Sequence, residues 1–192
     1  MKEWFGLISL VLALAGYAPY IKDIFAHKTK PHAFSWLVWA TLAAIAFAIQ
    51  LTHNAGAGAW LMGITTAATL FIFGLSIRYG ERRILPLDWL SLVFAGLALF
   101  LWFLTDRPFL SVILITLIDS IGGFVPTIRK SITNPHQETV SLYFIYGVSL
   151  CFSLLALRDF SFVNSFYSAS FIFIDWGMGT FLLLRRRNKN SL

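Results

Sequence analysis

Apolar residues along this chain gather into long runs that short polar or basic segments separate. Each run holds about 18 to 24 residues, enough for a helix rising about 1.5 Å per residue to cross roughly 30 Å of hydrocarbon. The pattern predicts seven transmembrane helices, over residues 4–22, 34–52, 58–77, 88–105, 109–128, 139–157 and 161–184. The expected fold class is therefore an all-α integral membrane protein.

Composition supports the membrane assignment. Of the 192 residues, 58% are hydrophobic and only 12% are charged, whereas a soluble domain carries about 25% charged residues. So much apolar surface cannot be hidden inside one small soluble core. The first run also admits a cleavable signal peptide ending near Ala15, but cleavage there would remove most of the first predicted helix. Cys151 is the only cysteine, so no internal disulfide can form.

The basic residues are distributed unevenly between the two ends of the predicted helices. Three lie on one side: Lys2, Arg107 and Arg158. Twelve lie on the other: Lys22, Lys28, Lys30, Arg78, Arg82, Arg83, Arg129, Lys130, Arg185, Arg186, Arg187 and Lys189. The positive-inside rule then places the N-terminus outside and the C-terminus in the cytoplasm. This bias accounts for the net charge of +6 without a nucleic-acid partner.

Two segments of the chain repeat each other. The first links two apolar runs through a proline-marked basic hinge, and a diverged copy follows about one hundred residues later. Pro19 and Pro126 are 107 positions apart, and Ser35 and Ser141 are 106 positions apart. Repeats of this kind set the fold. With the charge bias, they predict two parallel three-helix units, residues 1–80 and 108–192, joined by an inverting helix in residues 81–107.

The hinge residues resemble those of the PQ-loop superfamily, which includes the SWEET (MtN3) sugar transporters, cystinosin-like transporters and the KDEL receptor. In that family a helix ends in Pro-Gln, a basic segment carries Lys-Ser or Lys-Thr, and the next helix opens near a Ser. The matching residues here are Pro19-Tyr20, Lys28-Thr29 and Ser35, then Pro126-Thr127, Lys130-Ser131 and Ser141. Tyr20 and Thr127 stand where the family has Gln, so the subfamily is left open. The resemblance implies a 3+1+3 arrangement of seven helices.

Two acids lie deep within predicted helices. Asp119 is ten residues before Arg129, and Asp175 is ten residues before Arg185, which places both about 15 Å from the basic boundary. A carboxylate at the bilayer centre costs about 2.5–3.5 kcal/mol or more unless it is paired or hydrated. Either these acids face a water-filled cavity, or at least one is protonated. Two neighbouring carboxyl groups could also share a proton. They either join helices or take part in solute binding and proton coupling.

Other candidate binding residues lie near the same depth. Ser35 and Trp39 are four positions apart and so share a helix face. The repeat places Tyr146 on the corresponding helix of the second unit, and Thr65 is a polar residue of the third helix. SWEET-like transporters hold a sugar between paired Trp and Asn side chains, and the resemblance makes Trp39 and Asp175 the nearest matches. Packing between helices is the competing interpretation for the tryptophans.

Pro19 and Pro126 lie inside predicted helices near their basic ends. A proline within a helix removes one backbone hydrogen bond and kinks the helix. Each is therefore either a fixed kink or, as the resemblance implies, a hinge on which the two units rock. The histidines in the connections fit no metal-binding spacing and are expected at the surface.

These observations predict a transporter that moves a small polar solute, such as a sugar or an amino acid, by alternating access. The sequence leaves open whether this transport is coupled to protons. The alternative is a membrane receptor or scaffold that binds a ligand without transporting it. No cofactor, metal or enzymatic nucleophile is indicated. The expected partners are the solute and membrane lipid, with a second copy of the chain left open. Short loops favour a bacterial inner membrane.

Overall fold

The structure is a computed structural model that describes residues 1–81 and 107–190, together with residues 86, 89–90, 93–94, 96–97, 100 and 104. The described part is helical and contains no β-strand. Its α-helices are α1 (Lys2–Phe25), α2 (Ala33–Thr52), α3 (Trp60–Tyr79), α5 (Pro108–Ile118), α6 (Phe124–Thr133), α7 (Val140–Ala156) and α8 (Phe162–Asn190). Short helical turns complete it: η1 (Gly56–Ala59), the π-helical η2 (Asp119–Gly123) and η3 (Pro135–Gln137).

The prediction of long apolar helices is confirmed for six of the seven runs. Five helical spans are long and apolar enough to cross a membrane: Lys2–Phe25, Ala33–Thr52, Gly56–Tyr79, Pro108–Thr133 and Phe162–Asn188. The sixth, α7, is apolar but shorter, with 17 residues. The structure describes only scattered residues of 88–105. The fourth predicted helix therefore lies outside the part of the chain that the structure describes continuously. Five candidate spans and one shorter helix are therefore what the structure establishes of the predicted seven.

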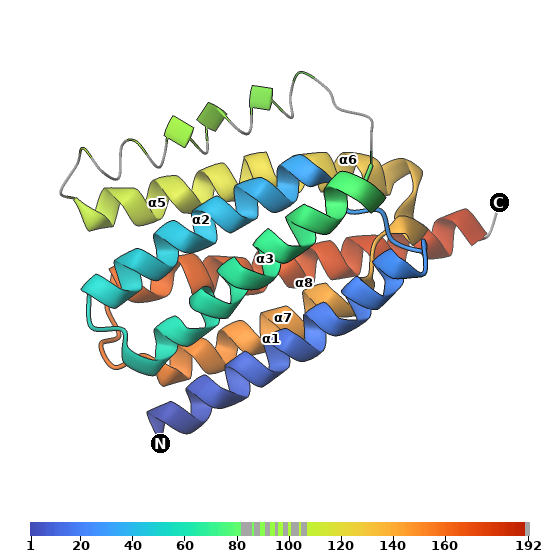
Figure 1. Cartoon of the computed structure of the whole chain (residues 1–192). Helices are drawn as coiled ribbons and strands as arrows, with labels where there is room; N and C mark the ends of the chain where they lie inside the picture. Colours follow the sequence, from blue (N-terminus) through green and yellow to red (C-terminus); the bar gives the residue numbers. More distant parts are fainter. Residues whose placement is uncertain are drawn as a thin grey trace.

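The helices form a closed ring. Within the described residues, α1 packs against α3 and α7, α2 packs against α3 and the α5–η2 segment, and α8 packs against α5 and α7. In the predicted repeat, α1 corresponds to α5–η2 and α2 corresponds to α7. The contact of α1 with α7 is therefore the counterpart of the contact of α5–η2 with α2. The first residues of α1 and the last turns of α8 lie at opposite ends of this bundle (Figure 1).

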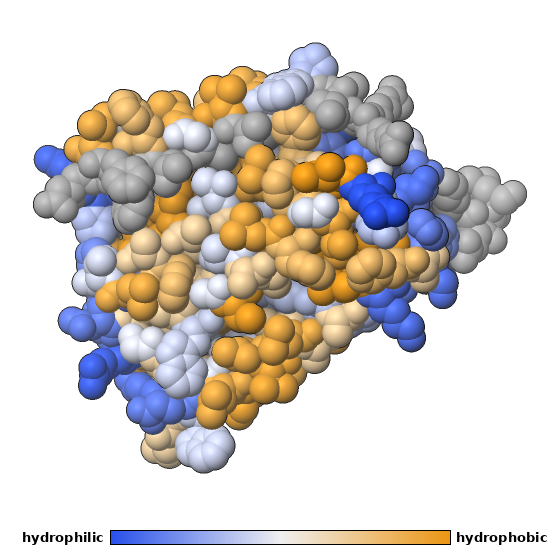
Figure 2. Space-filling view, viewed as in Figure 1, coloured by the Kyte–Doolittle hydropathy of each residue, from blue (hydrophilic) through white to orange (hydrophobic). Residues whose placement is uncertain are grey.

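The outer surface of the bundle is apolar. Large hydrophobic side chains that face outward include Leu51, Leu155 and Phe173, each more than half exposed. On the face drawn in Figure 2, apolar residues form a broad central zone, and hydrophilic residues gather at both ends. A monomeric soluble protein rarely exposes contiguous apolar surface on this scale. The distribution is that of a protein surrounded by lipid.

The span from Pro108 to Thr133 is interrupted by the π-helical turn η2. Pro126 lacks a backbone N–H and its ring crowds the carbonyl of Gly122, four positions earlier, which disfavours an ordinary α-turn there. The neighbouring pair Gly122-Gly123 lowers the local preference for an α-helix further. Single π-turns inside α-helices are frequent at functional sites, and this one begins at Asp119.

The start of α2 corrects one expectation. His32 was expected at the surface, yet its side chain is buried, and its Nδ1 accepts a hydrogen bond from the backbone N–H of Ser35 at 3.5 Å. It therefore caps the first turn of α2, a position where side-chain acceptors satisfy otherwise unpaired N–H groups. The sequence shows a His after Pro31 but does not show that neighbouring segments cover it.

Candidate functional site

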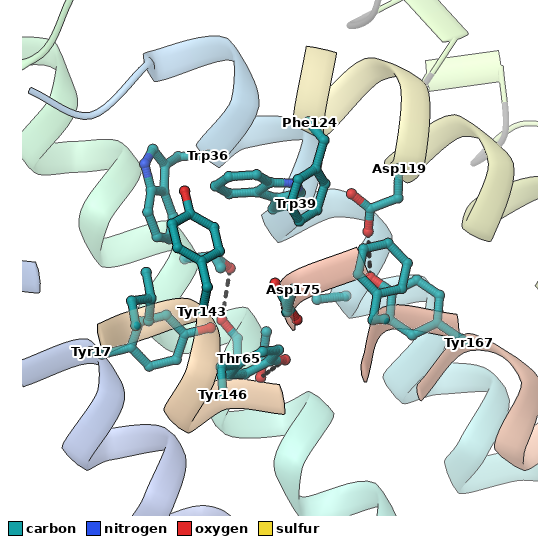
Figure 3. Close-up of a pocket in the computed structure, with 14 residues that line it drawn as sticks. Tyr17, Trp36, Trp39, Thr65, Asp119, Phe124, Tyr143, Tyr146, Tyr167 and Asp175 are labelled. Atoms are coloured by element: carbon teal, nitrogen blue, oxygen red, sulfur yellow. Dashed lines mark hydrogen bonds between the residues drawn. The ribbon is translucent and has the colours of Figure 1, made fainter. Parts of the chain in front are cut away.

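A cavity of about 60 Å³ lies inside the ring of helices. Figure 3 shows its side chains converging from helices of both halves of the chain. Six spans contribute to its wall, counting α5–η2–α6 as one. The lining residues are Tyr17, Trp36, Trp39, Ala43, Thr65, Thr69, Asp119, Phe124, Leu142, Tyr143, Tyr146, Tyr167, Phe171 and Asp175.

Asp119 projects from the π-turn into this cavity. Its side chain is only 1% exposed, and the Tyr167 hydroxyl of α8 donates a hydrogen bond of 2.5 Å to its Oδ2. Its other oxygen, Oδ1, has no hydrogen-bond partner among the described residues. One carboxyl oxygen is therefore held by Tyr167, and the other lies near the Trp39 indole N–H at the cavity wall.

Asp175 of α8 is the second acid of the cavity. It is 5% exposed, and its Oδ2 has no hydrogen-bond partner in the described part of the chain. In Figure 3 its carboxyl group lies between the Asp119–Tyr167 pair and the Thr65–Tyr146 pair. Burying a polar group without a partner is costly. An unpaired oxygen on each of two acids in one cavity is the arrangement expected of a site that a ligand or proton completes.

Another part of the cavity wall joins the two halves of the chain through hydroxyl groups. The Thr65 hydroxyl of α3 and the Tyr146 hydroxyl of α7 form a hydrogen bond of 2.7 Å. Tyr17 of α1 packs against Tyr146, with 5.7 Å between ring centroids. These contacts hold the polar groups of α3 and α7 in fixed positions at the cavity surface.

Aromatic rings supply most of the remaining wall. Trp36 and Trp39 of α2 pack edge to face, with centroids 4.9 Å apart and ring planes at 87°. Trp39 continues to Phe124 at 5.3 Å, and Phe171 stacks on Tyr167 at 4.6 Å. Such pairs each contribute about 0.5–1.5 kcal/mol beyond the area they bury. The rings thus form a stiff apolar frame around the two acids.

Gly123 permits the close approach of α2 to the π-turn. A Cβ atom at this position would lie 2.1 Å from Nε1 of Trp39 and 2.7 Å from Oδ1 of Asp119. Neither distance is compatible with non-bonded contact, so only glycine leaves room for both groups. The Trp39 indole N–H has no hydrogen-bond acceptor among the described residues. Gly123 therefore brings an unpaired donor and an unpaired acceptor to one place.

Five of the six predicted binding residues line this one cavity: Asp119, Asp175, Trp39, Thr65 and Tyr146. Their role in binding a solute stays a prediction. Ser35 is the exception. It is fully buried one helical turn closer to the basic end, where its hydroxyl accepts a hydrogen bond of 3.3 Å from Thr127 and lies 3.4 Å from Nδ1 of His32. Ser35 therefore joins α2 to α6 outside the cavity wall.

The two predicted hinge prolines lie within helices but do not line the cavity. Pro19 is inside α1, which continues as an α-helix to Phe25. Pro126 is the third residue of α6, directly after the π-turn. The structure thus places an irregular backbone next to only one of the two. Whether either proline acts as a hinge stays a prediction.

Between the cavity and the basic end lies a layer of buried polar contacts, which we call the basic-end seal. Lys130 forms a buried ion pair with Glu138 and donates a hydrogen bond of 2.5 Å to the carbonyl of Lys30. The cavity residue Tyr143 donates to the other oxygen of Glu138 at 3.2 Å. The seal therefore connects both halves of the chain and touches the cavity wall.

In a second contact of the seal, a charged side chain of the first half reaches the second half. The Thr139 hydroxyl donates to the Asp23 carboxylate of α1 at 2.9 Å, and it pairs with the Thr29 hydroxyl at 2.8 Å. Asp23 and Lys130 are 107 positions apart, the spacing of Pro19 and Pro126. Equivalent positions of the repeat thus reach across to the other half, with opposite charges.

Several lining residues were not among the predicted site residues. Tyr167, Phe171 and Asp175 recur every four residues along α8 and so share one face of the helix. Reading back from Asp175 at helical spacing would have found the first two. Glu138 carried no such signal, because its role depends on Lys130 approaching it after the chain turns through η3. Among the described residues, no group of three His, Cys, Asp or Glu side chains is placed to bind a metal ion.

Comparison with known proteins gives no match: no protein-family model fits the sequence, and neither a curated protein nor a solved structure resembles it significantly.

Proposed function

We propose that this chain is a membrane transporter that moves a small polar solute by alternating access. The transporter has seven transmembrane helices in a 3+1+3 arrangement. Its two three-helix units span residues 1–80 and 108–192, and the residues between them form the inverting helix. The observation that carries the proposal is the cavity that both units line and that holds two buried acids.

The placement of the cavity supports this function. Transporters built from repeats hold their substrate near the bilayer midplane at the interface between the repeats, beside irregular helix segments. Asp119 lies on the π-turn of such a segment, and the rest of the cavity wall comes from α1, α2, α3, α6, α7 and α8. Rocking one unit against the other would change the cavity walls together. A buried acid at this depth is by default a functional residue in a membrane protein.

The basic-end seal supports the proposal because its contacts would close the cavity on the basic side. Its contacts between the halves include the Lys130 to Lys30 carbonyl bond, the Thr139 to Asp23 bond and the Thr29–Thr139 hydroxyl pair. These contacts would separate when the cavity opens to the basic side. With the positive-inside rule, that side is the cytoplasm, which places the C-terminus inside and the N-terminus outside. A bacterial inner membrane is the proposed location.

Reconstitution into liposomes tests the proposal. We would measure uptake of radiolabelled glucose, glycine and methylammonium, with and without a pH gradient, against protein-free liposomes. Wild-type protein should take up at least one of them, and Asp119→Asn and Asp175→Asn should reduce that uptake. Asp159→Asn is the matched control, because Asp159 is exposed and outside the cavity. Uptake that is the same in all three variants would remove the role assigned to the acids.

A receptor or scaffold on the same architecture is the competing function. It predicts saturable binding of one of these solutes without net flux across the liposome membrane. The same preparation distinguishes the two, because equilibrium binding is measured in detergent and flux is measured in liposomes.

A further inference from the structure

We propose that the cavity binds a small organic cation, specifically an alkylammonium ion. This deepens the proposed function by naming the class of solute for the same cavity. The evidence is the charge of its polar groups, the types of hydrogen-bonding atom left unpaired, the aromatic wall and the volume.

The polar atoms that remain unpaired in the cavity are mostly acceptors. Oδ1 of Asp119 and Oδ2 of Asp175 lack hydrogen-bond partners among the described residues, as does one donor of the wall, Nε1 of Trp39, which lies beside Asp119. An alkylammonium ion offers only N–H donors and a positive charge. A sugar offers both donors and acceptors, and an anion would face two carboxyl groups. Among the described residues that line the cavity, none is Lys, Arg or His.

Most of the hydroxyl groups in the cavity wall are already hydrogen-bonded within the protein. Tyr146 pairs with Thr65, and Tyr167 donates to Asp119. Tyr143 donates to Glu138, and the Thr69 hydroxyl donates to the Thr65 carbonyl at 2.7 Å. A neutral polyol could still donate to these hydroxyl oxygens, but few hydroxyl hydrogens remain to bond its own oxygens, while an ammonium group can donate to the carboxyl oxygens.

Aromatic rings make up more than half of the lining residues. They are Tyr17, Trp36, Trp39, Phe124, Tyr143, Tyr146, Tyr167 and Phe171. A cation over the face of such a ring gains about 0.5–1 kcal/mol at exposed sites and about 2 kcal/mol or more when desolvated. Aromatic cages of this composition recognise alkylated ammonium groups. The alkyl part of the ion would contact rings while its charge remains near the acids.

The volume limits the size of the ion. One water molecule needs about 10–15 Å³ of cavity volume, so a cavity of 60 Å³ accommodates roughly four to six groups of that size. Methylammonium and tert-butylammonium fall within this limit. A hexose, with twelve heavy atoms, would require the cavity to expand.

The test compares two molecules of nearly the same shape that differ in charge. Thermal unfolding of the purified full-length protein in detergent would be followed with tert-butylammonium chloride and with tert-butanol, each over a range of concentrations at constant ionic strength. We expect tert-butylammonium to raise Tm saturably, with a Kd at least tenfold below that of tert-butanol. Equal shifts with both molecules, or a response to glucose alone, would overturn the proposal.

Variants locate the binding. Asp175→Asn should weaken tert-butylammonium binding at least tenfold. Trp39→Leu should weaken it severalfold, and Trp39→Phe should restore part of that loss, because a ring is retained. Asp159→Asn should bind as wild type. If the Asp175 and Trp39 variants do not fold, the comparison of the two molecules on wild-type protein still decides the question.

Failure of this inference is distinguishable from failure of the transport function. Binding of tert-butylammonium without flux in liposomes would keep the cation site and remove transport. Flux of glucose or glycine without cation binding would keep transport and remove the cation site.

Discussion

The helix α1 and the segment α5–η2–α6 share a sequence pattern but differ in backbone conformation. Both carry a glycine three positions before a proline, Gly16 with Pro19 and Gly123 with Pro126. Yet α1 remains an α-helix through its proline, and the later segment widens into a π-turn. A proline alone is therefore insufficient to break the helix, and the residues around it decide the outcome.

The local differences lie within one turn of the proline. Ala15 precedes Gly16 in the first copy, whereas Gly122 precedes Gly123 in the second, and a second glycine disfavours the α-helix by about 1 kcal/mol relative to alanine. Leu12 stands in α1 where the π-turn has Asp119. The repeat thus keeps its scaffold in both halves and confines its irregular backbone and its acid to one of them.

The largest expected difference in stability is between a variant of Lys130 and a variant of Asp23, its counterpart in the first half. Replacing Lys130 by Met leaves Glu138 as a buried charge without its ion-pair partner, which costs about 3–5 kcal/mol. The substitution Asp23→Asn retains an oxygen that accepts from Thr139, so we expect a loss of about 1 kcal/mol or less. Thermal unfolding in detergent compares the two. Equal losses would show that the seal is symmetric in energy as well as position.

Exchanging the residues at the acid position tests the asymmetry directly. Leu12→Asp places a carboxyl group in α1 without the Tyr167 partner and should destabilise the protein by about 2.5–3.5 kcal/mol. Asp119→Leu should leave stability nearly unchanged or raise it, because it removes a buried acid, while lowering transport at least tenfold. A stable, fully active Asp119→Leu protein would contradict the functional role of the π-turn acid.

The equivalent glycines give a smaller contrast. Gly123→Ala forces Trp39 and Asp119 to move, and overpacking of this kind costs about 1–3 kcal/mol. At Gly16 a Cβ atom would lie 3.4 Å from Cγ2 of Ile145, which is an ordinary contact. Gly16→Ala should therefore be neutral or stabilising by up to about 1 kcal/mol. The two Tm values, measured in the same detergent, check the order.

The sequence was sufficient to predict six of the apolar helices and the position of both acids within them. Hydropathy reports the length of apolar segments, and the spacing of Asp119 and Asp175 from the following arginines reports depth. Both kinds of signal are local. The cavity gathers Trp39, Thr65 and Tyr146 around the acids because the repeat places residues of equal depth on facing helices.

The remaining features depend on how helices rotate and meet, which hydropathy does not report. The spacing of Ser35 from Trp39 places both on one face of α2, but contacts from α6 cover Ser35. The partnership of Lys130 with Glu138 forms only after the chain folds back through η3. The π-turn depends on the packing of α2 against Gly123 as well as on local sequence.

The central claim is that the cavity between the two halves is reached by water in turn from both sides of the membrane. Its most direct test is chemical labelling of Thr65→Cys in a Cys151→Ser background, since Cys151 is the only native cysteine. A small, membrane-impermeant, positively charged thiol reagent would be applied to either side of oriented vesicles. The buried residue Leu150, which does not line the cavity, provides the control variant Leu150→Cys. We predict that the cysteine at position 65 is labelled from both sides and protected by tert-butylammonium, while the control stays unlabelled; a cysteine at position 65 that reacts from neither side until the protein is unfolded would contradict the account.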